Sequence, residues 1–204
     1  QYDQRVGART AAGCESSVAF CRLDHSGRGL GLVVGCRPEV MLMDAEVGAL
    51  DAIYYPAFQL ALKGAQTMAV TDCLNFGNPK KNIIMTEFVT SVDALAKASK
   101  QLNAPIISGN VSFYNETLDE NIISTPATGV VGLRDSVEKI TPDCFQNPFE
   151  SLILVQMNWV ESWSGVATLF DKPLKYKMNS SNQVPEFIET CAKLDKNLTE
   201  KDIS

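Results

Sequence analysis

Histidine is almost absent from this sequence, and its cysteines are not grouped as metal ligands. The 204 residues contain one histidine, and none of the six cysteines forms a C-x-x-C pair. Zinc sites use closely spaced cysteine and histidine side chains, so the sequence argues against a zinc centre. Disulfides are not expected either, because nothing in the sequence points to export into an oxidising compartment.

Long apolar runs and excess positive charge are also lacking. No run approaches the roughly 18 apolar residues that a membrane span needs, and the N-terminus has no apolar signal-peptide core. Lysine and arginine total 18 against 24 acidic residues, which gives a formal net charge of −6. We therefore expect a cytoplasmic protein whose partners include neither a membrane nor nucleic acid.

An initiator methionine is missing as well, and we expect the chain to be a piece of a longer protein. What is present is an ordinary globular composition, with 45% hydrophobic and 21% charged residues. A chain of this length can bury the core of one domain, or of one domain plus part of another. A composition break near residues 140–150 predicts a boundary between a domain at 1–140 and a partial second domain at 141–204.

The order of apolar patterns predicts a mixed α/β or α+β fold. Two apolar runs around Asp24–Gly29 predict a β-hairpin. Apolar residues at helical spacing predict a helix over 84–102, whereas a helix over 49–63 is weakened by Pro56. Further elements are expected as strands at 66–71, 106–108, 128–133 and 151–159 and as a weak helix at 184–195.

Two polar clusters follow short apolar strands. The first is TDCLNFGNP at 71–79, and the second is SGNVSFYNET at 108–117. One helix lies between them, so the two strands can lie side by side with their loops opening on one edge. That edge would hold the oxygen ligands of Asp72, Asn75, Asn78, Asn110, Ser112 and Asn115.

These residue types suit a phosphate ligand held with a metal ion. Carboxylate and amide oxygens are ligands for Mg²⁺ that keeps some water and touches phosphate. Gly77 and Gly109 would let a ligand approach the backbone closely. We expect the side chains of Asp72 and Asn110 to open onto the same surface. The alternative is that Asn-Phe-Gly-Asn-Pro is only a turn, and the residues alone leave both interpretations open.

Over these motifs the chain is similar to a known family. TDCLNFGNP, then SGNVSFYNET and TPATGVVGL, with the opening QYDQRVG, resembles the second half of the large subunit of small-type phosphoribosylformylglycinamidine synthase. The resemblance covers residues 1–140 and is densest from 69 to 133. It implies an aminoimidazole-ribonucleotide-synthase-like N-terminal domain, which is half of a pseudo-dimeric barrel, followed by a truncated second α/β domain.

The resemblance implies an ATP-dependent ligase of de novo purine biosynthesis. In that family ATP activates the formamide oxygen of formylglycinamide ribonucleotide, and glutamine-derived ammonia displaces phosphate to give formylglycinamidine ribonucleotide. By this resemblance, Asp72 and Gly109 would contact ATP. Asn110 would hold Mg²⁺ and Ser112 would contact the substrate. The Mg²⁺ would neutralise charge on the transferred phosphoryl group.

The family's active site is composite, so the resemblance also implies partners. These are the missing N-terminal half of the synthase, which carries the catalytic histidine, and a glutaminase subunit that supplies ammonia. We expect no catalytic residue in this chain and no product formation by the chain alone. A homodimer could mimic the pseudo-dimer, because the two halves that meet in the family are homologous.

One departure from the family pattern keeps two alternatives open. Where family members carry Thr-Asp-Cys-Asn-Pro, this chain has Val34-Gly35-Cys36-Arg37-Pro38, so a carboxylate is missing at Gly35. The chain could therefore be a non-catalytic half that only scaffolds the pseudo-dimer. It could also be another ATP-binding member of the same superfamily.

Overall fold

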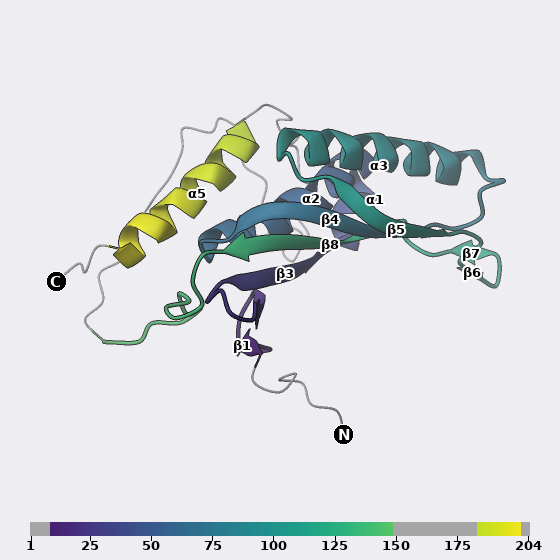
Figure 1. Ribbon diagram of the computed structural model, residues 1–204. Helices are drawn as coiled ribbons and strands as arrows, with labels where there is room; N and C mark the ends of the chain where they lie inside the picture. The colour runs from purple at the N-terminus through teal and green to yellow at the C-terminus, as the bar shows by residue number, and fades with distance from the viewer. Residues whose placement is uncertain (1–8, 149–182, 201–204) are drawn as a thin grey trace, which may run out of the picture.

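The computed structural model describes residues 9–148 and 183–200, and its centre is a six-stranded sheet (Figure 1). The strand order is β1-β2-β3-β8-β4-β5, and among these neighbours only β4 and β5 run parallel. The strands are β1 (Thr10–Ala12), β2 (Ala19–Arg22), β3 (Gly29–Gly35), β4 (Gln66–Asn75), β5 (Ile106–Ser112) and β8 (Thr125–Arg134). A short ribbon after β5 consists of β6 (Glu116–Thr117) and β7 (Glu120–Asn121). The helices are α1 (Pro38–Met43), α2 (Ala45–Leu62), α3 (Asn82–Gln101) and α5 (Gln183–Glu200).

This arrangement confirms the expected mixed α/β class. The predicted hairpin is β2 and β3, the predicted central helix is α3, and the weak helix at 184–195 falls within α5. The strand expected at 151–159 lies outside the described residues. The division into domains at 1–140 and 141–204 stays a prediction. No helix in the described part of the chain has the length and apolar content to cross a membrane.

The two faces of the sheet differ in what covers them. Along β3, Val33 and Gly35 are buried, whereas Leu30, Leu32 and Val34 are exposed. Helix α2 packs on the buried side against β3, β4 and β8, and α3 packs beside α2 (Figure 1). Among the described elements no helix covers the opposite side. That side is called the open face below.

Helix α2 starts before the expected range and continues through Pro56. Its N-terminus is capped by Asp44, whose carboxylate accepts a backbone hydrogen bond. Proline has no N–H, so the carbonyl of Ala52 loses its helical partner at this turn. The buried Thr128 hydroxyl of β8 donates to that carbonyl instead. A contact from a distant strand thus satisfies the group that Pro56 leaves free.

Strands β4, β5 and β8 are longer than the sequence predicted. β4 continues to Asn75 and β5 continues to Ser112, so Asp72 and Asn110 lie within paired strands rather than in the loops beyond them. Aspartate, asparagine and glycine are poor strand formers. Here β4 is hydrogen-bonded to a neighbour on each side, and this pairing overrides the local preference.

Helix α3 buries most of the face that its periodicity predicted. Leu95 and Ser99 are buried, and Phe88 packs against the core. Val92 lies at helical spacing from Phe88 and Leu95 but is 39% exposed, and the fully buried Ser91 takes the neighbouring position.

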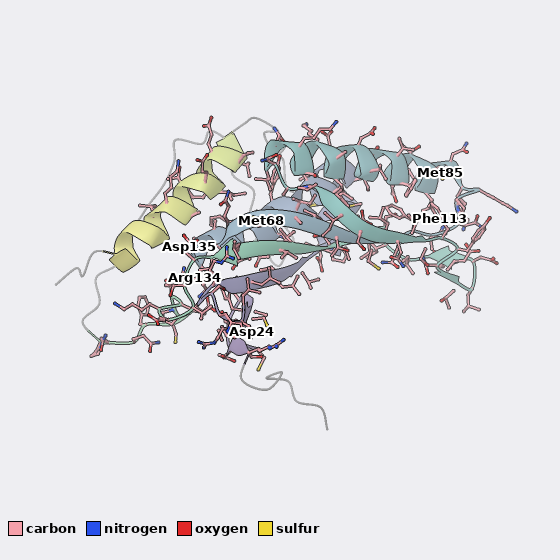
Figure 2. The ribbon with its side chains drawn as sticks, in the orientation of Figure 1. Asp24, Met68, Met85, Phe113, Arg134 and Asp135 are labelled. Carbon is pink, nitrogen blue, oxygen red and sulfur yellow. The ribbon has the colours of Figure 1, made fainter. Side chains whose placement is uncertain are left out.

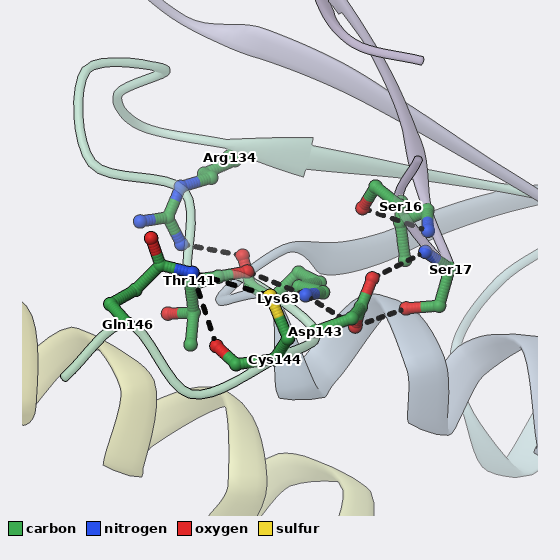
Figure 3. Close-up of polar contacts among 9 residues, drawn as sticks. Ser16, Ser17, Lys63, Arg134, Thr141, Asp143, Cys144 and Gln146 are labelled. Carbon is green, nitrogen blue, oxygen red and sulfur yellow. Dashed lines mark hydrogen bonds and ion pairs between the residues drawn. The ribbon is translucent and has the colours of Figure 1, made fainter. Parts of the chain in front are cut away.

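The segment after β8 is anchored to the C-terminus of α2 by a buried lysine (Figure 3). Lys63, at the C-terminus of α2, donates to the carbonyl of Thr141 (2.5 Å) and pairs with the carboxylate of Asp143 (2.6 Å). That carboxylate also accepts from the Ser17 backbone N–H (2.7 Å) and hydroxyl (3.0 Å). The hydrogen bond from Lys63, followed by the one from the Ser17 backbone, lowers the pKa of Asp143 to about 2. Three segments of the chain therefore meet at one ion pair.

Candidate functional site

Four residues form a row across the sheet where the two polar clusters begin. Gly35 of β3 pairs with Thr128 of β8, and Thr128 pairs in turn with Asp72 of β4. On its other side, Asp72 pairs with Gly109 of β5. Directly paired residues share a face of the sheet, and Thr128 is buried against α2. The side chain of Asp72 therefore lies on the helix-covered face.

The carboxylate of Asp72 occupies the space that a side chain at Gly109 would need. A Cβ atom at Gly109 would overlap with Oδ1 of Asp72. Burial raises the pKa of Asp72 above its ordinary value. Among the described residues, no hydrogen bond or ion pair reaches this carboxylate. A half-buried carboxylate in this state is available to a hydrogen-bond donor or a cation.

Asn110 and Ser112 lie on the open face instead. The register pairs Asn110 with Cys73 and Ser112 with Asn75. Successive side chains of a strand point to opposite faces, so these four residues point away from the side that carries Asp72. The expectation that Asp72 and Asn110 open onto the same surface is therefore wrong, although their strands are adjacent.

Asparagine side chains join the two clusters beyond the strand ends. Nδ2 of Asn115 donates to the carbonyls of Phe76 (2.9 Å) and Ser112 (3.0 Å). The backbone N–H of Asn78 donates to Oδ1 of Asn121 (2.8 Å). Asn121 lies outside both motifs, and its place shortly after the second cluster was the only sequence signal for it.

Three phenylalanine rings, one from α3 and two from these loops, pack together. Phe88 of α3 packs edge to face on Phe76 (centroids 5.2 Å apart) and on Phe113 (5.0 Å). Figure 2 shows Phe113 near Met85, at the end of the sheet opposite Arg134. The loops of the two clusters therefore rest on a packed aromatic base at one end of the sheet.

Gly35, where the resemblance led us to expect a carboxylate, is closely packed. A Cβ atom at Gly35 would overlap with the carbonyl of Ala52 and the ring of Pro56. Just after Gly35, the guanidinium of Arg37 lies over the ring of Tyr55, 4.3 Å from its centroid. It also forms an ion pair with the buried Asp51. Helix α2 therefore fills the space beside the end of β3.

The residues present meet only part of what a magnesium ion requires. In the described part of the chain, no three His, Cys, Asp or Glu side chains are grouped as a metal site. Asp72 and Asn110 each offer a hard oxygen ligand, but on opposite faces of the sheet. Mg²⁺ commonly takes one or two protein ligands and completes its shell with water and phosphate oxygens. The donor set therefore fits Mg²⁺ that arrives with a phosphate ligand.

Comparisons with known proteins agree on one family. A family model described as AIR synthase related protein, N-terminal domain, matches residues 17–132. Phosphoribosylformylglycinamidine synthase subunit PurL of Sulfurovum is 36% identical over 156 residues, which cover 76% of this chain and 21% of that protein. The Anaeromyxobacter subunit is 39% identical over 160 residues, with the same coverage of 76% and 21%. The chain spans about a fifth of the length of these curated relatives.

Solved structures of Thermotoga maritima PurL are similar to this fold. The structure described as PurL complexed with AMPPCP has a TM-score of 0.58 at 28% identity, covering 63% of this chain and 22% of that one. The structure described as PurLQS has a TM-score of 0.59 at 28% identity, with coverage of 65% and 22%. The family match at 17–132 contains both polar clusters and the four residues of the row across the sheet, which are Gly35, Thr128, Asp72 and Gly109.

Proposed function

Because the chain belongs to the AIR synthase related family, we propose that it is part of an ATP-dependent ligase of purine biosynthesis. The reaction would convert formylglycinamide ribonucleotide, glutamine-derived ammonia and ATP to formylglycinamidine ribonucleotide. The curated relatives support this, since they are phosphoribosylformylglycinamidine synthase subunits. The chain matches about a fifth of their length, so we assign the complete activity to a larger cytoplasmic assembly.

One observation carries the proposal: the strands of the two clusters are neighbours, with Asp72 directly beside Gly109. In the proposal, the nucleotide approaches the backbone of Gly109 along the outer edge of β5, which ends the strand order, because the Asp72 carboxylate fills the space on the helix-covered face. The Asp72 carboxylate then accepts hydrogen bonds from donor groups of ATP, because an ionised carboxylate repels phosphate oxygens. T. maritima PurL has been solved in complex with ATP, which supports nucleotide binding in this family.

Asn110 and Ser112 take the metal and the substrate in this proposal. The exposed amide of Asn110 supplies one hard ligand to Mg²⁺, and phosphate and water supply the rest. A nucleotide that lies along the outer edge of β5 would bring its phosphates beside Asn110, although Asp72 faces the other side of the sheet, and Mg²⁺ bound there would neutralise their charge. Ser112 contacts formylglycinamide ribonucleotide, and T. maritima PurL complexed with FGAR supports this substrate class.

The open face of the sheet supports a protein partner. Leu30, Leu32, Val34 and Met68 are each at least 40% exposed on this sheet, and contiguous exposed apolar side chains mark interaction surfaces. We propose that the N-terminal half of the synthase covers this face, with a second copy of the chain as the substitute when that half is absent. A glutaminase subunit would supply ammonia to the assembly.

A second candidate function is favoured by the packing at Gly35. Pro56 and Ala52 fill the space where the family pattern places a carboxylate. A half without that carboxylate could retain its partner surface and lose nucleotide binding. The chain would then be a non-catalytic scaffold of the same pseudo-dimer.

Calorimetric titration of ATP with Mg²⁺ into the purified chain separates these candidates. We expect binding that Asp72→Ala weakens at least tenfold, whereas the surface control Asp24→Asn leaves it unchanged. Absence of ATP binding, together with assembly onto a separately expressed N-terminal half, would favour the scaffold. Absence of both ATP binding and assembly would contradict both candidates.

A further inference from the structure

The side chain of Asn115 connects the ends of β4 and β5 and faces the hydroxyl of Ser112. Its Nδ2 donates to the carbonyls of Phe76 (2.9 Å) and Ser112 (3.0 Å). Its backbone N–H also donates to the carbonyl of Phe76 (3.2 Å). The half-buried carboxamide is therefore held from both strands at once.

The two carbonyls fix which way this carboxamide points. Nδ2 carries two protons, and the two backbone carbonyls take both of them. The flipped orientation would place Oδ1 of Asn115 against two carbonyl oxygens, which repel it. Oδ1 is therefore left facing the hydroxyl of Ser112 at 3.3 Å, and this hydroxyl donates to it. Nδ2 lies 3.2 Å from the same hydroxyl oxygen, but its protons are already engaged.

We propose that Asn115 is a positioning residue that makes Ser112 a hydrogen-bond acceptor for the ligand. A serine hydroxyl has one proton and two lone pairs. With the proton held by Asn115, Ser112 offers only lone pairs, so it recognises an N–H or O–H group and disfavours a phosphate oxygen. This inference rests on the proposed function, in which that group is an amide N–H or a sugar hydroxyl of the ribonucleotide substrate.

A first experiment tests the orientation without any ligand. NMR measures hydrogen exchange of the two Nδ2 protons of Asn115 in the full chain and in Ser112→Ala. We expect slow exchange in both proteins, because backbone carbonyls hold these protons. If Ser112→Ala makes the exchange fast, Nδ2 donates to the serine hydroxyl and the acceptor assignment is overturned.

A second experiment tests the recognised group. Calorimetry measures the binding of formylglycinamide ribonucleotide and of inorganic phosphate to the chain, to Ser112→Ala, to Asn115→Ala and to the double variant. We expect each single variant to bind the ribonucleotide roughly tenfold more weakly, with no further loss in the double variant. Phosphate binding should be the same in all four proteins.

The outcomes of the second experiment separate the inference from the proposed function. An equal loss of phosphate affinity in Ser112→Ala overturns the acceptor role, and additive losses in the double variant overturn the positioning role of Asn115. Thermal melting shows whether Asn115→Ala is folded, and Ser112→Ala alone decides the acceptor role if it is not. If the unaltered chain binds no ribonucleotide, the substrate contact assigned to Ser112 in this chain fails, and the exchange experiment still decides the orientation.

Discussion

Replacing Asp143 by asparagine should destabilise the fold at neutral pH by removing the charge partner of Lys63. The lysine side chain is 4% exposed and the Asp143 side chain is 38% exposed. Breaking a fully buried ion pair costs about 3–5 kcal/mol, whereas exposed pairs contribute about 0–1 kcal/mol. Because solvent screens the more exposed Asp143, we expect Asp143→Asn to lower the free energy of unfolding by about 1–2 kcal/mol. The melting temperature should fall by roughly 2–8 °C.

The lowered pKa of Asp143 determines how the stabilisation changes with pH. The folded state lowers the pKa of Asp143 to about 2, below its ordinary value of 3.8. The stabilisation is therefore fully present above pH 3.8 and is lost as the pH falls through about 2. Urea denaturation of the chain and of Asp143→Asn, from pH 7 downward, should show their difference shrinking between these limits.

A matched control is the exposed pair of Arg9 and Asp24, whose side chains are 58% and 51% exposed. Asp24→Asn removes the same charge and should cost less than about 0.5 kcal/mol. Equal losses for Asp143→Asn and Asp24→Asn would refute the role of the buried lysine. A difference that stays constant from pH 7 to below pH 3 would refute the electrostatic origin.

Four further predictions concern α2, the site and the activity of the chain. Thr128→Val should lower the free energy of unfolding in urea by about 1–3 kcal/mol, because the carbonyl of Ala52 loses its donor. The loss should be smaller when Pro56→Ala restores the helical N–H, and an equal loss would contradict this account. Asp72→Asn should raise stability at pH 7, because burial raises the pKa of Asp72 and so penalises its ionised form; the gain should vanish as the pH falls below that raised pKa, and a loss at pH 7 would show an unseen partner. In a full-length enzyme carrying this segment, Asn110→Ala should slow turnover by raising the activation free energy by roughly a few kcal/mol, with little change in melting temperature. Comparable losses of activity and of thermal stability would show that Asn110 has a structural role. The chain alone, given ATP, Mg²⁺, formylglycinamide ribonucleotide and high ammonium, should release no ADP above the blank, and clear substrate-dependent release would show a complete enzyme.

The elements that the sequence predicted well are those determined by local pattern. The hairpin of β2 and β3 and the helix α3 follow from alternation and from helical spacing, and both occur in the structure. The predicted ends of β4 and β5 were too early, because aspartate and asparagine are poor strand formers. In the structure, Asp72 and Asn110 are held in strands by pairing with residues distant in sequence. The contact of Thr128 with Ala52 has the same long-range origin.

The sequence correctly predicted that the two motifs lie on neighbouring strands, but it did not predict that Asp72 and Asn110 face opposite sides of the sheet. Side chains alternate along a strand, so the pairing of Asp72 with Gly109 rather than with Asn110 decides which surface each residue faces. A sequence pattern predicts which surface a side chain faces only when the pairing of the two strands is known to within one residue. The roles of Asp72, Gly109, Asn110 and Ser112 themselves stay predictions.

The close packing around Gly35 has a consequence for which substitutions the chain can accept. Any larger residue at position 35 would collide with the ring of Pro56 and the carbonyl of Ala52. That carbonyl is engaged by Thr128, so α2 cannot shift away without leaving a buried group unsatisfied. A side chain at position 35 therefore requires a change at position 56 as well. Position 35 is therefore open to variation only in combination, so a library that randomises this position alone should recover only glycine.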